Sequence, residues 1–156
     1  MIKRIQIVLL SVVIMLIQTI TLAASSSPVG TWKTIDDVTG KEKSILRITE
    51  SNGVLAGTIV KIFPEPGHYL NGLCDYCDGP YHNKRLEGVT VLRGMTAEAG
   101  NPGHWSGGKI TDPKNGKTYR CAIEVTDGGQ TLNVRGYIGI QLLGRTQVWH
   151  RVNNAK

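Results

Sequence analysis

The amino-acid sequence predicts an all-β fold, an eight-stranded antiparallel meander closed into a small barrel. From about residue 28 onward, short runs rich in β-branched residues alternate with turn sequences, and no long stretch shows helical periodicity. Eight such runs follow one another, and most are joined by tight turns, which favours antiparallel neighbours. Closing the meander into a barrel leaves no exposed sheet edge, so we prefer it to the alternative, a two-sheet sandwich.

The first two dozen residues have the order of a secretory signal peptide. A basic start precedes an apolar run over 7–17, and small residues follow at 22–26. The strongly apolar part is shorter than the roughly 20 residues that span a bilayer, so cleavage is favoured over a retained anchor. We expect a signal-peptide helix over residues 1–24, cleaved after Ala23 or Ser25, and export to the periplasm or out of the cell.

The remaining chain, residues 28–153, has the length of one ordinary domain. The full chain carries a formal net charge of +6, and the signal segment removes two basic residues and no acidic one, which leaves +4. The basic residues are spread along the domain rather than gathered in a run. We therefore interpret them as solvated strand faces and expect no nucleic-acid partner.

In the first half of the domain, Asn52-Gly53 is the firmest turn signal, because both residue types tolerate positive φ in a two-residue hairpin. An irregular segment over 63–87, rich in Pro, Gly, Asp and Asn, follows the third strand. A loop of this length in a small domain is usually functional or covalently restrained. The strands expected in this half are Gly30–Asp36, Ser44–Glu50, Val54–Ile62 and Gly88–Met95.

The second half is punctuated by turns over 112–117 and 127–129 and by a glycine-containing link over 138–144. Alternation along the strand over 118–126 places Cys121 on the inward face. The strands expected in this half are Trp105–Thr111, Thr118–Thr126, Gln130–Tyr137 and Arg145–Val152.

The sequence Gly30-Thr31-Trp32 resembles the Gly-x-Trp start of lipocalin-like (calycin) barrels. In those barrels the tryptophan closes one end and commonly packs under an arginine from the last strand. The resemblance implies the same place for Trp32 here, with Arg145 or Arg151 over it. It also implies a lipocalin-like barrel, whose eight-stranded interior is either filled by side chains or holds one small ligand.

Four longer stretches resemble a bacterial exported family known as domain of unknown function 2147. Together they extend over nearly the whole domain. The resemblance implies an exported, calycin-like small barrel, and it supplies no substrate or catalytic residue to carry over. The stretches are Gly30–Asp37, Cys74–Gly79, Trp105–Pro113 and Val134–Ile140, the last running on through Leu143–Gln147 to Trp149.

The three cysteines allow several arrangements. Cys74 and Cys77 lie in a loop of an exported chain, which favours a small structural disulfide. A redox-active pair would need a helix after the first thiol, and the Asp-Gly-Pro sequence at 78–80 disfavours one. A zinc site that adds Cys121 and a histidine is another alternative, although a single Cys-x-x-Cys is a weak signal for it. Cys121 is expected to be a buried free thiol, and a bridge from it to Cys74 or Cys77 stays open.

Two arginines next to glycines are candidates for a ligand site. Arg135 and Arg145 lie among apolar residues near the last strands, and an inward-pointing arginine must be paired because a buried lone charge is very costly. The structural interpretation is stacking on Trp32 or Trp149, and the functional one is anchoring an acidic ligand head. The tentative ligand-binding residues are Trp32, Arg135, Tyr137, Arg145 and Trp149.

The sequence offers no constellation of residues typical of catalysis, and its acidic residues suit turns. We therefore expect a non-enzymatic exported barrel, without metal or cofactor, that binds a small amphipathic molecule and does not insert stably into the membrane after cleavage. The alternative is a solid barrel that serves as a structural or interaction module, with the long Cys74–Cys77 loop as the surface that contacts an envelope protein. A zinc- or redox-active cysteine enzyme is the third interpretation. The solid barrel would be favoured by a filled interior together with exposed apolar residues in the loop, such as Tyr69, Leu70, Leu73 and Tyr76.

Overall fold

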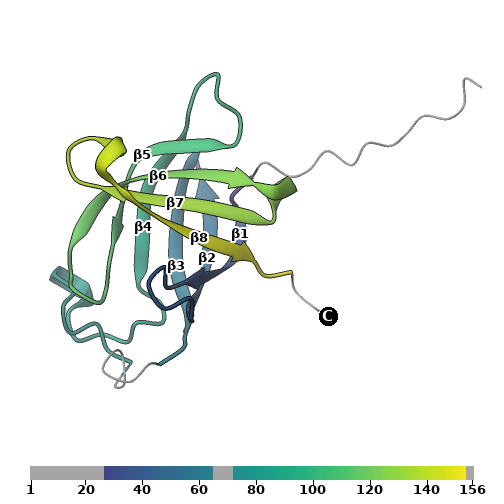
Figure 1. Ribbon diagram of the computed structural model, residues 1–156. Helices are drawn as coiled ribbons and strands as arrows, with labels where there is room; N and C mark the ends of the chain where they lie inside the picture. Colours follow the sequence, from purple (N-terminus) through teal and green to yellow (C-terminus); the bar gives the residue numbers. More distant parts are fainter. Residues whose placement is uncertain (1–26, 65–71, 154–156) are drawn as a thin grey trace, which may run out of the picture.

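The computed structural model describes residues 27–64 and 72–153 (Figure 1). The expected signal peptide over 1–24 lies outside the described residues, as do Tyr69 and Leu70. Across the part of the chain that is described, no helix is long and apolar enough to cross a membrane.

Eight antiparallel strands form a closed barrel in chain order, with β8 pairing back to β1 (Figure 1). The predicted meander and its closure are confirmed, and each strand lies within two residues of its expected bounds. The strands are β1 Gly30–Ile35, β2 Glu42–Ser51, β3 Val54–Ile62, β4 Thr90–Ala97, β5 His104–Thr111, β6 Thr118–Thr126, β7 Thr131–Tyr137 and β8 Arg145–Arg151.

Short connections turn the chain at each end of the barrel. Asn52 and Gly53 join β2 to β3 with φ of 50° and 76°, the left-handed values that the Asn-Gly hairpin signal requires. Among the described residues, three 3₁₀ helices lie in other connections, η1 Gly79–Tyr81, η2 Asp127–Gly129 and η3 Gln141–Leu143.

Trp32 and Arg151 close one end of the barrel. The Trp32 side chain is fully buried, and its indole N–H donates to the carbonyl oxygen of Pro28 at 2.7 Å. The guanidinium of Arg151 lies 4.2 Å from the centroid of the Trp32 ring and donates to the carbonyl oxygens of Val29 and Ser27 at 2.9 and 2.8 Å. Of the two arginines expected over the tryptophan, Arg151 is the one that occupies the position.

The closed end explains why a glycine begins the Gly-x-Trp sequence. Gly30 has φ of 140°, and a Cβ built on it would lie 2.5 Å from Nη1 of Arg151. Any other residue would therefore strain the backbone and displace the arginine from the Trp32 ring.

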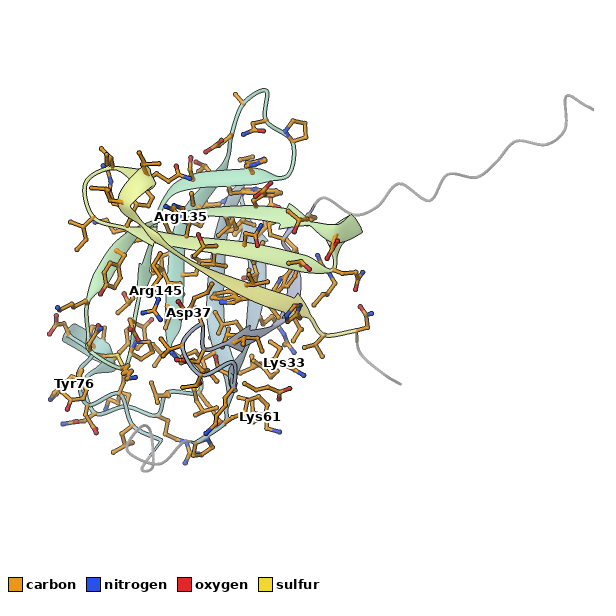
Figure 2. All side chains as sticks on the ribbon, viewed as in Figure 1. Lys33, Asp37, Lys61, Tyr76, Arg135 and Arg145 are labelled. Atoms are coloured by element: carbon orange, nitrogen blue, oxygen red, sulfur yellow. A yellow bond between two sulfur atoms is a disulfide. The ribbon has the colours of Figure 1, made fainter. Side chains whose placement is uncertain are left out.

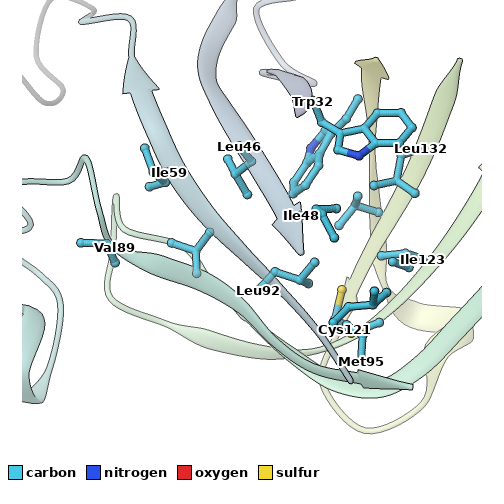
Figure 3. Packing of buried hydrophobic residues seen from close by; sticks show 14 of the residues in the cluster. Trp32, Leu46, Ile48, Ile59, Val89, Leu92, Met95, Cys121, Ile123 and Leu132 are labelled. Atoms are coloured by element: carbon cyan, nitrogen blue, oxygen red, sulfur yellow. The ribbon is translucent and has the colours of Figure 1, made fainter. Parts of the chain in front are cut away.

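Large apolar side chains fill the interior next to this closed end (Figure 3). Cys121 lies among them as a free, buried thiol, and burial raises its pKa to about 12. The predicted inward face of β6 is therefore confirmed, and the thiol behaves as a small apolar group. The fully buried members are Trp32, Ile48, Leu55, Leu92, Met95, Cys121 and Leu132.

The segment between β3 and β4 is held by a disulfide between Cys74 and Cys77, which confirms that prediction and rules out the alternative bridges to Cys121. Both half-cystines are buried. The backbone of Cys74 donates to the carbonyl oxygen of Lys84 at 2.8 Å and accepts from the N–H of Asn83 at 3.1 Å. The loop is thus restrained covalently and by its own hydrogen bonds.

Candidate functional site

The half of the barrel opposite Trp32 holds a cavity of about 240 Å³. Its wall combines an apolar floor with polar groups nearer the open end, and every strand contributes to it. The apolar lining includes Leu46, Ile59, Ile62, Val91, Ile110, Val134 and Trp149. The polar lining includes Thr34, Ser44, Thr111, Tyr119 and Gln147, and three charged residues, Lys43, Asp112 and Arg145, complete it at the end we call the mouth.

The cavity exists because small residues take inward positions in this half of the barrel. Gly136 is one of them, and a Cβ built there would lie 3.5 Å from Cβ of Tyr119, an ordinary contact distance. Thr34 and Ser44 occupy inward positions on β1 and β2. At the closed end the corresponding space is taken by tryptophan, leucine and methionine side chains.

Hydroxyl and amide groups form a polar wall. The hydroxyls of Thr34 and Ser44 lie 2.8 Å apart, and the side-chain oxygen of Gln147 accepts from the Trp149 indole N–H at 3.1 Å. Tyr119 adds a phenol to the lining from β6. Hydroxyls keep a second acceptor lone pair after one hydrogen bond, so this wall can still bind a polar neutral group.

The two cations at the mouth are compensated by carboxylates of the β1–β2 turn. The guanidinium of Arg145 makes a two-pronged ion pair with the Asp37 carboxylate (Figure 2), and this hydrogen bonding raises the pKa of Arg145. Lys43 Nζ lies 3.7 Å from the Asp36 carboxylate. The mouth therefore presents no uncompensated arginine to an acidic ligand head.

Asp36 and Asp112 shape the turns that surround the mouth, as the sequence predicts. The Asp36 carboxylate accepts from the backbone N–H groups of Thr39 and Val38 at 2.8 and 3.0 Å. These bonds, that from Thr39 first, lower the pKa of Asp36 to about 2. Asp112 accepts from the backbone N–H of Lys114 at 3.0 Å in the same manner.

The structure brings together two of the five residues singled out as ligand-binding. Arg145 and Trp149 line the cavity, whereas Trp32 lies in the packed closed end. The prediction that Arg145 stacks on a tryptophan is wrong, because its guanidinium binds the Asp37 carboxylate instead. Ligand contact by Arg145 and Trp149 stays a prediction.

The inward placement considered for Arg135 is also wrong. Its guanidinium lies outside the barrel and donates to the carbonyl oxygens of Gln141 and Leu142 at 2.7 and 2.8 Å. Gly136 takes the inward position on β7, and because side chains alternate along a strand, Arg135 and Tyr137 point outward. Neither of these two lines the cavity.

Several cavity residues were missed because single hydroxyl and amide side chains belong to no motif. Thr34, Ser44 and Gln147 are examples. Tyr119 could have been found, since it shares the predicted inward face with Cys121 two residues along β6.

The same geometry settles the pairing of the cysteines. Cys74 and Cys77 are bonded to each other, and Cys121 is buried separately in the barrel. Within residues 27–64 and 72–153, no group of three or more His, Cys, Asp or Glu side chains could hold a metal ion. The filled interior expected for the solid barrel is not observed, because the open half is hollow, whereas Tyr76 of the loop is exposed as that interpretation expects.

Comparisons with known proteins agree with this architecture. The family described as "Uncharacterized protein conserved in bacteria (DUF2147)" matches residues 30–151. Among solved structures, protein HP1028 from the human pathogen Helicobacter pylori, of the lipocalin family, is similar with a TM-score of 0.67 and 20% identity. The match covers 83% of this chain and 86% of that one, and at this identity it shows the fold alone. No curated protein matches the chain.

Proposed function

This chain belongs to the DUF2147 family, and we propose that it binds a small amphipathic molecule in the open half of its lipocalin-like barrel. The observation that carries the proposal is the cavity itself, with an apolar floor and a polar wall in one continuous space. Ligand sites are typically concave and mostly apolar, with a few polar groups that orient the ligand. An amphipathic molecule would place its apolar part against Val134 and Trp149 and its polar part near Ser44 and Gln147.

The cavity volume limits the size of this molecule. At about 240 Å³ it lies below the roughly 300–1,000 Å³ of typical ligand pockets. It would hold a short chain or a single ring, or the apolar end of a longer molecule whose remainder stays outside the mouth.

The wall chemistry favours a neutral head group over an acidic one. Arg145 is bound by Asp37 and Lys43 faces Asp36, so an anionic head would have to displace an existing partner. Neutral hydroxyls can instead exchange hydrogen bonds with Thr34, Ser44 and similar groups at little electrostatic cost. A binding protein fits this site better than an enzyme, because the nearby carboxylates are engaged in turns and ion pairs.

A titration with straight-chain alcohols of six to twelve carbons and the matching carboxylates tests the proposal. The indole of Trp149 lies in the cavity wall, so saturable fluorescence changes would report binding there. We expect the alcohols to bind at least as tightly as the carboxylates of equal length. Binding that does not saturate for any chain length would contradict the proposal.

Two adjacent substitutions make a matched pair for this titration. Gly136→Val adds a side chain on the inward face, where the backbone is not left-handed and a Cβ would meet Tyr119 at an ordinary contact distance of 3.5 Å, beside the cavity. Tyr137→Leu changes the next residue, which lies on the outer face. We expect Gly136→Val to weaken alcohol binding at least tenfold and Tyr137→Leu to leave it within about twofold, since a methyl-sized overlap in a packed site costs about 1–3 kcal/mol.

The proposal extends to the compartment and includes export to the periplasm or beyond. The Cys74–Cys77 disulfide supports it, because structural disulfides persist in oxidising compartments, and so does the basic and apolar order of residues 1–24. Denaturing mass spectrometry of the protein from fractionated cells tests this point. A full-length, reduced protein in the cytoplasmic fraction would contradict it.

A further inference from the structure

The connection between β7 and β8, residues 138–144, exposes an unusual set of large aliphatic side chains. Ile138, Ile140, Leu142 and Leu143 are 74%, 60%, 80% and 78% exposed. Single exposed apolar residues are ordinary on protein surfaces, but four within six positions of one connection make a contiguous apolar patch. The connection projects from the barrel where β7 ends and β8 begins (Figure 1).

Hydrogen bonds from the barrel wall hold this connection in place. Arg135 on β7 donates to the carbonyl oxygens of Gln141 and Leu142, and Arg120 on β6 donates to that of Gly139 at 3.4 Å. The 3₁₀ helix η3 adds a backbone bond from Gly144 to Gln141 at 3.0 Å. The aliphatic side chains are therefore presented to solvent by a restrained backbone rather than by a loosely tethered loop.

A row of positive charges on the outer wall leads to this connection. Strand register places Arg93 opposite Lys109 and Lys109 opposite Arg120 across β4, β5 and β6. None of the three takes part in a salt bridge among the described residues. Like charges directly opposite each other destabilise a sheet, so a row of three cations is unfavourable unless a group of opposite charge lies against it.

We propose that the connection and the basic row together dock the open end of the barrel onto an anionic lipid bilayer. Aliphatic side chains that insert at the headgroup boundary and cations that face lipid phosphates are the two contributions on which peripheral membrane binding rests. Both lie side by side here, since Arg120 of the row hydrogen-bonds the connection itself. Protein–protein hot spots are instead enriched in Trp, Tyr and Arg, with Leu under-represented, and the patch consists of Ile and Leu alone.

Docking in this manner places the cavity beside the bilayer. Arg145 lines the cavity and directly follows the connection in the chain. An amphipathic ligand could then pass between the bilayer and the barrel without crossing bulk water. This transfer step rests on the proposed function, whereas the docking does not.

Co-sedimentation with vesicles of phosphatidylethanolamine and phosphatidylglycerol (3:1) tests the proposal, using the chain from residue 26 onward and, in parallel, the full chain. We expect the wild type to bind and Leu142→Asp/Leu143→Asp to lower the partition coefficient at least tenfold, because about tenfold is lost per large aliphatic side chain removed from the apolar phase. Lys109→Glu should lower it severalfold on these vesicles and not on neutral phosphatidylcholine vesicles. Val54→Asp is the control, since Val54 is an exposed apolar residue in the β2–β3 hairpin at the opposite end of the barrel.

Several results would overturn the proposal. They are absence of wild-type binding, binding unchanged in the double aspartate variant, or equal loss in Val54→Asp. A fourth is a concentration-dependent dimer, seen without vesicles, that the double variant abolishes; the patch would then be a self-association surface. Both leucines are largely exposed, so the double variant should unfold at the wild-type temperature, which a thermal melt checks. Alcohol titration without vesicles separates the two proposals, because Leu142→Asp/Leu143→Asp should leave cavity binding unchanged.

Discussion

The two ends of this barrel use the same residue types for different purposes. At the closed end Arg151 lies over the buried Trp32 ring and donates to backbone carbonyl oxygens. At the open end Trp149 lines a cavity, and Arg145 reaches out to Asp37 with a side chain that is 62% exposed. Burial lowers the pKa of Arg151, whereas the Asp37 hydrogen bond raises that of Arg145.

The difference shows how one strand meander can be both a packed core and a container. On β2 and β7 the successive inward residues become smaller or more polar toward the mouth, from Ile48 to Ser44 and from Leu132 to Gly136, and the interior is packed at one end and hollow at the other. We expect stability to depend mainly on the closed end and binding mainly on the open end.

The largest difference in stability between the two ends should appear when one inward side chain is truncated at each end. Trp32→Ala leaves a large void in the packed half, and we expect it to reduce the free energy of unfolding by about 3–5 kcal/mol. Ile62→Ala removes a half-buried side chain that already borders the cavity, so we expect a loss of about 1 kcal/mol. Urea unfolding of both variants measures this, and equal losses would mean that the two ends are packed alike.

Replacing Arg151 at the closed end and Arg145 at the open end should give the next largest difference in the free energy of unfolding. Arg151→Met removes the cation over Trp32 and strips donors from carbonyl oxygens at the closed end, which should cost about 2–3 kcal/mol. Arg145→Met breaks an exposed ion pair and should cost less than about 1 kcal/mol. Chemical denaturation at neutral pH compares them, and a larger loss for Arg145→Met would reverse our assignment of structural roles.

Acid should weaken the turn beside the mouth through Asp36. Its pKa is about 2 in the folded protein, below its ordinary value of 3.8, so the folded state binds the proton more weakly. The resulting stabilisation, up to about 2 kcal/mol, is present above pH 4 and is lost as pH falls toward 2. Asp36→Asn should be less stable at pH 7 and should show a shallower decline between pH 4 and 2. Unfolding free energies of wild type and variant, measured in parallel across this pH range, test the assignment. Equal slopes between pH 4 and 2 would contradict it.

The smallest effect concerns the specificity of the mouth. Asp37→Asn removes the anion that binds Arg145 and should change stability by less than about 1 kcal/mol. The freed guanidinium should tighten carboxylate binding about three- to tenfold and leave alcohol binding unchanged. Calorimetric titration with the two ligand series measures this, and unchanged carboxylate affinity would show that Arg145 does not reach the ligand head.

Sequence patterns predicted the architecture well because alternation, turn chemistry and cysteine spacing act locally. The Asn52-Gly53 hairpin, the Cys74–Cys77 disulfide and the burial of Trp32 were all accessible in this way. These features depend on neighbours a few residues apart or on a recognisable start of the barrel.

The site was less predictable because register between strands determines it. On β7, either Arg135 or Gly136 could line the cavity, depending on which of the two points inward. The sequence pattern singled out Arg135, whereas Gly136 is the residue that lines the cavity. The basic row is another example, since Arg93 and Lys109 are 16 positions apart in the chain and become neighbours only through strand pairing. Scattered charges in a sequence can thus become a cluster on a sheet.

The most direct test of the central claim follows the indole N–H resonances of Trp32 and Trp149 during titration with a straight-chain alcohol. The Trp149 indole N–H is bound to Gln147 in the cavity wall, and that of Trp32 is bound to Pro28 at the closed end. We predict a saturable shift of the Trp149 resonance while the Trp32 resonance stays in place. A shift of Trp32 alone, or of neither resonance at saturating alcohol, would contradict a binding cavity in the open half of the barrel.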